Sequence, residues 1–194
     1  MLASPVAALS QARAIAKPKI GLVTGLSGTG KTDLSNWMVR ECGFLHFDGD
    51  IRDGNGIDFC NLRSEWNQFW ERNDASRLAE TLNARSLDAG SNGALLSLPS
   101  TAVFTPERLQ ATKAVGIETV LLFGRPEHCI GAYLERERMI GSSLTEDDWR
   151  RNNQHVYDQY SATDFDQVRI KAFNPNGSRV PRGEIVEAVL GRFK

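Results

Sequence analysis

Cysteine is scarce in this sequence. The three cysteines, Cys42, Cys60 and Cys129, lie far apart, and no Cys-x-x-Cys pair occurs. This argues against a disulfide framework and against the usual zinc sites, because both depend on paired or closely spaced cysteines. A reducing compartment is the simplest setting for such a chain, so we expect a cytoplasmic protein.

Long apolar runs and an excess of positive charge are also missing. No apolar run approaches the roughly 18–20 residues that a membrane-spanning helix needs, so no membrane partner is expected. The formal net charge is −1, which provides no overall positive field to hold nucleic acid. A net charge near zero is compatible with a local basic patch, so nucleic acid is a possible but not favoured partner. The sequence does not predict the oligomeric state.

Acidic residues are absent from the first part of the chain, where Asp33 is the first to appear. Residues 1–17 are rich in alanine and carry Arg13 and Lys17, a character shared with transit peptides, although those contain more arginine and serine. We therefore expect residues 1–18 to be a short N-terminal extension, and residues 19–194 to form one domain, which the length of 194 residues permits.

Apolar runs alternate with helical patterns along the rest of the chain. This alternation predicts an α/β fold with a five-stranded, mainly parallel sheet and helices on both of its faces. The predicted strands are 19–24, 44–47, 94–98, 119–123 and 168–172. The predicted helices include 31–42, 75–89, one that starts at Thr105-Pro106, 127–138, one that starts at a capping box at Thr145–Asp148, and 182–193.

A phosphate-binding pattern joins the first predicted strand to the first helix. Gly25-Leu26-Ser27-Gly28-Thr29-Gly30-Lys31-Thr32 matches G-x-x-x-x-G-K-[ST]. Glycines allow a tight turn whose amide groups point at phosphate oxygens, and the helix adds its N-terminus. Lys31 can reach the terminal phosphates and Thr32 can bind Mg²⁺, so we expect ATP and Mg²⁺. The nucleotide-binding candidates in this loop are Gly25, Ser27, Gly28, Thr29, Gly30, Lys31 and Thr32.

Two aspartates follow the second predicted strand, in Phe47-Asp48-Gly49-Asp50. Ligands of an open parallel sheet lie beyond the carboxyl ends of its strands, so Asp48 and Asp50 should share an edge with the phosphate loop. One carboxylate would hold Mg²⁺ and the other would accept the proton of an attacking hydroxyl. We take Asp48 as the metal candidate and Asp50 as the base, although the sequence does not fix which aspartate has which role.

The loop and the Phe-Asp-Gly-Asp segment together resemble the P-loop small-molecule kinases, namely gluconate, shikimate and adenylylsulfate kinases. The resemblance implies a three-layer P-loop NTPase fold with a lid at about 136–148 and a helical acceptor-binding region at about 51–90. It implies that Arg136 or Arg138 contacts the phosphates from the lid, and that Asn174 and Pro175 begin the adenine loop. It also implies an acceptor site, whose candidates are Asp50, Arg52, Arg63, Pro99 and Ser100.

The sequence departs from these families in two places. The third strand, Leu95-Leu96-Ser97-Leu98-Pro99, lacks their glycine-rich or Cys-Ser-Ala-Leu-Lys patterns, and residues 51–75 fit none of the three. The resemblance therefore leaves the acceptor undefined. No histidine has metal-ligand spacing, and we assign none of the three a role.

The pattern predicts an ATP- and Mg²⁺-dependent kinase acting on a hydroxyl group of a small molecule. One alternative is a kinase for a nucleoside, a nucleotide or a hydroxymethylated base in nucleic acid. Another is a regulatory P-loop ATPase, although the Asn-Lys-x-Asp and Leu-Ser-Gly-Gly-Gln signatures of switch GTPases and transporter ATPases are absent. A degenerate fold that only binds a partner is disfavoured by the intact Lys31-Thr32.

Overall fold

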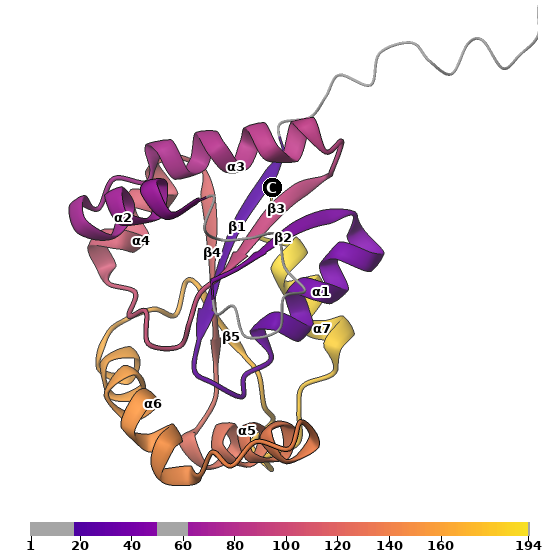
Figure 1. The fold of residues 1–194 in the computed structure, drawn as a ribbon, viewed down its shortest axis with the longest axis vertical. Helices are drawn as coiled ribbons and strands as arrows, with labels where there is room; N and C mark the ends of the chain where they lie inside the picture. The colour runs from indigo at the N-terminus through magenta and orange to yellow at the C-terminus, as the bar shows by residue number, and fades with distance from the viewer. Residues whose placement is uncertain (1–17, 50–61, 194) are drawn as a thin grey trace, which may run out of the picture.

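The computed structural model describes residues 18–49 and 62–193, which form a parallel sheet between two layers of helices (Figure 1). The strands are β1 (Lys19–Gly25), β2 (Phe44–Asp48), β3 (Gly93–Ser97), β4 (Ile117–Phe123) and β5 (Arg169–Lys171). The helices are α1 (Lys31–Cys42), α2 (Arg63–Arg72), α3 (Ser76–Asp88), α4 (Pro106–Ala114), α5 (Pro126–Met139), α6 (Glu146–Ala162) and α7 (Arg182–Leu190).

The strand order is β2-β3-β1-β4-β5, and all four pairings are parallel. The predicted five-stranded α/β fold is thus confirmed, with a sheet that is wholly parallel in the described part of the chain. β1 lies in the centre, so the loop after it leaves from the middle of the sheet. Asp48 pairs in register with Ser97, and Val23 pairs with both Ser97 and Val120. The carboxyl ends of these strands therefore meet at one edge.

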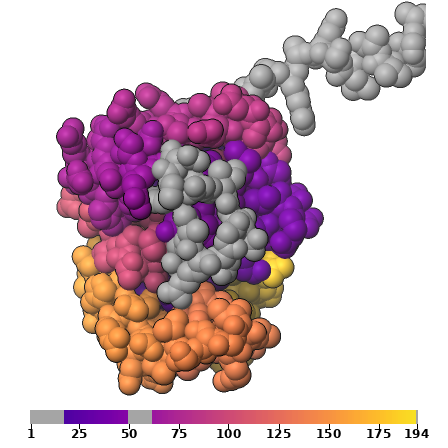
Figure 2. Space-filling view, in the orientation of Figure 1, coloured from indigo at the N-terminus to yellow at the C-terminus, as the bar shows by residue number. Residues whose placement is uncertain are grey.

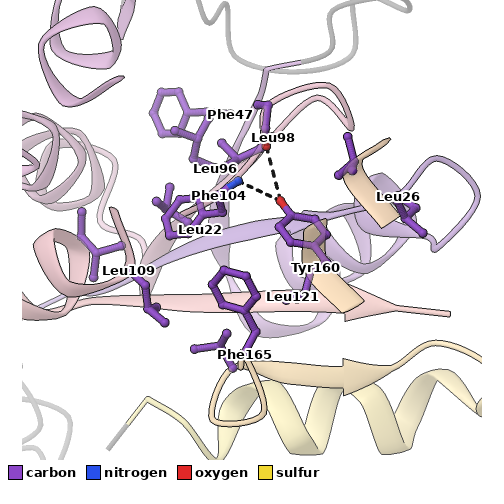
Figure 3. Packing of buried hydrophobic residues seen from close by; sticks show 14 of the residues in the cluster. Leu22, Leu26, Phe47, Leu96, Leu98, Phe104, Leu109, Leu121, Tyr160 and Phe165 are labelled. Carbon is purple, nitrogen blue, oxygen red and sulfur yellow. Dashed lines mark hydrogen bonds between the residues drawn. The ribbon is translucent and has the colours of Figure 1, made fainter. Parts of the chain in front are cut away.

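Alternate residues of each strand point into two separate cores. On one face, Val23, Phe44 and Leu95 pack with α1 and α7. On the other face, side chains such as Leu22 and Leu96 pack with helices α2 to α6. Figure 3 shows this second core, in which the Tyr160 hydroxyl accepts a hydrogen bond from the Phe104 amide. Burial on both faces explains why the central strands are continuous apolar runs.

Local sequence signals place several helix boundaries. The Thr105 side chain accepts a hydrogen bond from the Arg108 amide and Pro106 opens α4, as predicted. The Thr145–Asp148 capping box at the start of α6 is confirmed in both directions. The last helix ends at Leu190, three residues before the predicted end, although Phe193 still packs against Phe44.

Two groups of helices occupy opposite ends of the face seen in Figure 2: α5 and α6 lie at one end, and α2 and α3 at the other. The described part of the predicted acceptor-binding region is therefore distant from the predicted lid. Within residues 18–49 and 62–193, no helix combines the length and the apolar character needed to cross a membrane.

Candidate active site

The phosphate loop has a conformation that only glycine accommodates at its tightest points. Gly28 has a φ of 90°, and a Cβ atom there would lie 2.2 Å from the backbone oxygen of Cys129 on α5. A Cβ at Gly25 would lie 2.2 Å from the oxygen of Leu122. The glycines of the motif thus serve both a positive φ and a close approach of neighbouring backbone.

Some backbone amides of the loop donate hydrogen bonds within the protein, and others do not. Ser27 donates its amide to the Asn153 side chain at 2.8 Å, and Thr29 donates to the Leu26 oxygen at 3.3 Å. Within the described residues, the amides of Gly28 and Gly30 have no hydrogen-bond acceptor. The first helical bond of α1 runs from Leu34 to Gly30, so the first-turn amides before it have no partner inside the helix. The amides of Gly28 and Gly30 are therefore available to an anion.

Lys31 folds back along the loop. Its ammonium group donates to the backbone oxygens of Gly25 at 2.8 Å and Leu26 at 3.2 Å. The side chain is half-buried, so its charge is held beside the amide groups and is not extended into solvent. This position suits contact with an anion that enters the loop.

Thr32 and Asp48 form a pair of oxygen donors at the end of the sheet. The Thr32 hydroxyl lies 3.4 Å from Oδ2 of Asp48, and Ser97 donates its hydroxyl to Oδ1 at 3.2 Å. A hydroxyl and a carboxylate are hard ligands of the kind that Mg²⁺ prefers. Among residues 18–49 and 62–193, no group of three or more His, Cys, Asp or Glu side chains could hold a metal ion. Mg²⁺ is usually bound by one or two protein carboxylates together with substrate phosphates.

A cavity of about 400 Å³ opens in front of the loop and contains this pair. Among the residues that the structure describes, the charged side chains of its lining are Lys31, Arg136, Arg179, Arg182, Asp33 and Asp48. In this described part, positive side chains outnumber carboxylates by four to two, although the whole chain has a net charge of −1. The local balance therefore favours a polyanion such as a nucleoside triphosphate.

A second cavity, of about 250 Å³, lies on the other side of Ser27. It is lined by Ser27, Pro99, Ser100, Thr101, Tyr133, Arg136, Asn152 and Asn153. Ser27 and Arg136 line both cavities, so the two spaces meet at these side chains. The hydroxyls of Ser27 and Ser100 are 2.8 Å apart. Hydroxyl and amide groups in such a lining can orient a polar molecule beside the phosphate loop.

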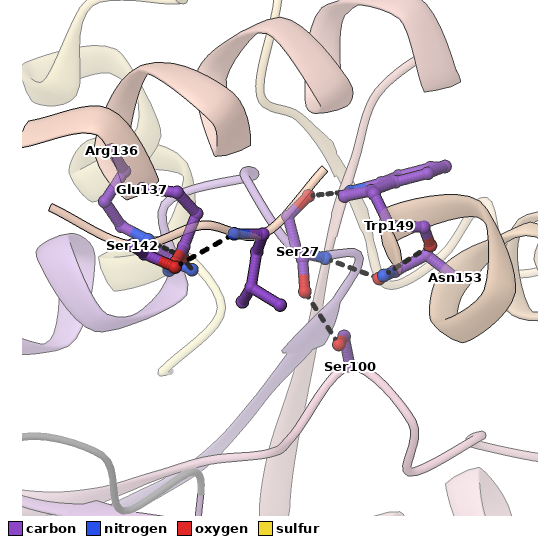
Figure 4. Close-up of polar contacts among 8 residues, drawn as sticks. Ser27, Ser100, Arg136, Glu137, Ser142, Trp149 and Asn153 are labelled. Atoms are coloured by element: carbon purple, nitrogen blue, oxygen red, sulfur yellow. Dashed lines mark hydrogen bonds and ion pairs between the residues drawn. The ribbon is translucent and has the colours of Figure 1, made fainter. Parts of the chain in front are cut away.

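Helix α6 clamps the loop at Ser27 (Figure 4). The Trp149 indole donates to the Ser27 oxygen at 2.9 Å, while Asn153 accepts from the Ser27 amide. Asn153 also donates to the Trp149 oxygen at 3.0 Å, one helical turn earlier. Both side chains are buried. The backbone of Ser27 is therefore fixed by a part of the chain more than 120 residues away.

The two predicted lid arginines differ in position. Arg136 lines both cavities and pairs with the buried carboxylate of Glu137. Both side chains are exposed, but Arg138 lines neither cavity. Residues two apart on a helix point to different faces, and here the face of Arg136 is the one that meets the loop.

The remaining predicted site residues are spread more widely. Pro99 and Ser100 line the second cavity. Arg63 is exposed at the start of α2 and lines neither cavity. Asp50 and Arg52 lie outside the described residues.

The predicted adenine loop is a tight turn after β5. Asn174 donates its amide to the Ser178 oxygen at 2.8 Å, and Phe173 pairs with Arg179. Asn174 and Pro175 do not line a nearby cavity of about 270 Å³ between α1 and α7, whereas Arg179, Val180 and Pro181 do.

Two arginines of the site were missed by the sequence analysis. Arg179 donates to the Gly28 oxygen at 3.2 Å, and Arg182 makes two hydrogen bonds to the carboxylate of Asp33 on α1. Both line the larger cavity. The signal was the basic segment Ser178-Arg179-Val180-Pro181-Arg182 between the last strand and the last helix.

Burial changes the acidity of two groups near the loop. Burial lowers the pKa of His46, and the neighbouring Asp48 carboxylate acts in the opposite direction. Burial raises the pKa of the Cys129 thiol to about 12. Cys129 is therefore a neutral packing group beside Gly28 at any ordinary pH, and it is not a nucleophile.

Comparison with known proteins places the fold. A gluconokinase from Sinorhizobium meliloti 1021 is 16% identical and has a TM-score of 0.49, with 91% of this chain and 92% of that chain covered. A shikimate kinase from Bacteroides thetaiotaomicron is 17% identical at a TM-score of 0.44, with 89% and 95% covered. An uncharacterized protein from Eubacterium ventriosum ATCC 27560 is 12% identical at a TM-score of 0.51, with 90% and 97% covered.

This chain shares the fold of the Eubacterium ventriosum protein. The gluconokinase and the shikimate kinase bear the names of two of the families that the sequence resembles. No protein-family model matches the sequence, and no curated protein matches it either.

Proposed function

We propose that the protein is an ATP- and Mg²⁺-dependent kinase that transfers the γ-phosphate of ATP to a hydroxyl group of a small molecule. The observation that carries this proposal is the pair of cavities that meet at Ser27 and Arg136. One cavity has the phosphate loop and the cationic side chains, and the other has a polar lining beside the same loop. A phosphoryl donor and an acceptor could therefore lie next to each other.

The phosphate loop is the proposed binding site for the β- and γ-phosphates. The amides of Gly28, Gly30 and the first turn of α1 would donate to phosphate oxygens. The Lys31 ammonium group would leave the backbone oxygens of Gly25 and Leu26 and donate to phosphate oxygens instead. Arg179 and Arg182, which line the phosphate cavity, would also contact the phosphates of the nucleotide. Arg136 would stabilise the negative charge that spreads over the moving phosphoryl group.

Thr32 and Asp48 are the proposed protein ligands of Mg²⁺, because their oxygens already lie 3.4 Å apart at the edge of the phosphate cavity. When bound, the ion would neutralise and orient the phosphate groups. Asp48 is held from both sides by hydroxyl groups, so it is oriented before a ligand arrives.

The acceptor would occupy the cavity lined by Pro99, Ser100 and Asn152. Its hydroxyl oxygen would form a bond to the γ-phosphorus while the bond to the β–γ bridging oxygen breaks and ADP leaves. The hydroxyl proton would pass to a carboxylate, for which Asp50 is the candidate. No covalent intermediate on the protein is needed.

A transfer assay tests this function. The protein is incubated with γ-³²P-labelled ATP, Mg²⁺ and panels of sugars and sugar acids, of nucleosides, and of hydroxymethylated DNA. We expect label to move to a small-molecule hydroxyl, and to stay on ATP when the acceptor is omitted. Label on the DNA or nucleoside panel alone would identify the alternative acceptor class. Hydrolysis that no acceptor accelerates would instead support a regulatory ATPase.

A further inference from the structure

A chain of hydrogen bonds connects α1 to Asp48 through the interior of the protein. The Asn36 side chain lies 3.1 Å from Nδ1 of His46, and Nε2 of His46 lies 2.8 Å from the Ser97 hydroxyl. Ser97 donates to Oδ1 of Asp48, and Oδ2 of Asp48 accepts from Thr32. Four hydrogen bonds thus run from the middle of α1 through β2 and β3 and back through Asp48 to the start of α1.

Strand geometry explains why these residues meet. His46 and Asp48 are two apart on β2, so both point to the face covered by α1. Ser97 is the direct partner of Asp48 on β3. His46 is 6% exposed and Ser97 1% exposed. The sequence alternation did not show this, because both faces of the sheet are covered and His46 and Phe47 are both buried.

Hydrogen-bond accounting fixes the direction of the chain. A serine hydroxyl has one proton, and that of Ser97 is given to Asp48. The Ser97 oxygen must then accept from Nε2 of His46, so this ring nitrogen carries a proton. The other ring nitrogen, Nδ1, lies 3.1 Å from the Asn36 side-chain amide. On a neutral ring with its proton at Nε2, Nδ1 is an acceptor, so the Asn36 amide must present its NH₂ group there, flipped from the orientation with Oδ1 toward the ring. Each member is therefore oriented by the one before it.

We propose that Ser97 and His46 are positioning residues that orient the Asp48 carboxylate for the Mg²⁺–nucleotide complex. Rotation of a carboxylate moves both oxygens together, so the Ser97 hydrogen bond to Oδ1 also sets the direction of Oδ2 next to Thr32. Partners that orient a metal-binding side chain typically contribute about 10–100-fold in metal affinity. This inference rests on the proposed nucleotide site.

The test measures binding without turnover. Isothermal titration calorimetry with a non-hydrolysable ATP analogue, with Mg²⁺ and then with EDTA, separates the metal-dependent part of the affinity. We expect Ser97→Ala to lower the affinity with Mg²⁺ by about tenfold or more and to leave the affinity in EDTA unchanged. His46→Gln should act in the same direction, and Ser97→Thr, which keeps the hydroxyl, should restore most of the loss.

Thr119→Val is the matched control. Thr119 is a buried residue of β4 that shares a hydrogen bond with Thr112, far from Asp48 in the sheet order. The Thr119→Val variant should lower the unfolding temperature as Ser97→Ala does, without changing how the affinity for the ATP analogue depends on Mg²⁺. Equal Mg²⁺ dependence in wild type and Ser97→Ala would overturn the positioning role alone. A wild type that binds the analogue neither with nor without Mg²⁺ would overturn the nucleotide site and the inference together.

Discussion

Ser27 is held from two sides that differ in origin. On one side, the loop from Gly25 to Thr32 is shaped by its own glycines and by the helix that follows it. On the other side, α6 contacts the same residue through Trp149 and Asn153. The first arrangement is contained in eight consecutive residues, whereas the second depends on how distant helices pack. The comparison indicates that the loop supplies phosphate-binding groups and that α6 fixes where they point.

Removal of the Lys31 charge from the loop should give the largest loss of phosphoryl-transfer rate among the variants. We predict that Lys31→Met lowers phosphoryl transfer by about 10²–10³-fold, because the lost ammonium group would stabilise transition-state charge. The methionine keeps most of the aliphatic stem, so the unfolding temperature should change little. Transfer rates and thermal unfolding are measured together. A rate within tenfold of the wild type would remove Lys31 from the mechanism and weaken the loop's side of the comparison.

Arg136 lies on α5, outside both the loop and α6, and lines both cavities beside Ser27. We predict that Arg136→Ala lowers kcat by about 10²-fold with a smaller effect on KM, since its charge acts mainly on the transferring phosphoryl group. Arg138→Ala is the matched variant two residues along the same helix, where the equally exposed side chain lines neither cavity. Its effect should be below about threefold. Equal losses in the two variants would show that the contribution is a general field and not a contact.

The sequence predicted what is local and left open what depends on packing. The loop, the capping box at Thr145 and the order of strands and helices along the chain follow from patterns of a few residues, and the structure confirms this order along the chain and the capping box. The choice between Arg136 and Arg138 needed the direction of α5, which no local pattern specifies.

Contacts between residues far apart in the sequence were also beyond prediction. Ser27 and Asn153 are 126 positions apart, and His46 and Ser97 are 51 apart. Such pairs follow from strand order and helix packing, which a single sequence constrains weakly. The role of Arg63 in binding the acceptor stays a prediction. Arg63 is exposed at the start of α2 and lines neither cavity.

The clamp from α6 can be removed without touching the loop. We predict that Asn153→Leu lowers the free energy of unfolding by about 1–3 kcal/mol, because the buried Asn153 side chain no longer accepts from the half-buried Ser27 amide or donates to the Trp149 oxygen. Nucleotide affinity should fall with it, since Ser27 is no longer fixed. Denaturant unfolding and calorimetry measure the two effects. Asn152→Ala, at the exposed neighbour, should cost less than about 0.5 kcal/mol. Equal costs would mean that the clamp contributes nothing.

The smallest expected effect is at the start of α6, one turn before Trp149. Thr145 accepts from the Asp148 amide and donates to the Asp148 carboxylate. We predict that Thr145→Ala lowers the free energy of unfolding by about 1 kcal/mol at neutral pH. Thr105→Ala at the start of α4 should cost a similar amount, but only Thr145→Ala should also weaken nucleotide binding slightly, because only α6 contacts Ser27.

Acid should reduce the difference between wild type and Thr145→Ala. The hydrogen bond from the Thr145 hydroxyl, followed by that from the Thr145 amide, lowers the pKa of Asp148 below its ordinary value of 3.8. Stabilisation by this carboxylate is therefore complete above that value and is lost as the pH falls through the lower pKa of the folded state. In unfolding curves, the difference between the two free energies of unfolding, constant from pH 7 down to about pH 5, should narrow as the pH falls below 3.8 and through the lower pKa of the folded state. A difference that stays constant at the acid end as well would mean that Thr145 acts on the backbone alone, and that Asp148 has no part in holding α6 against the loop.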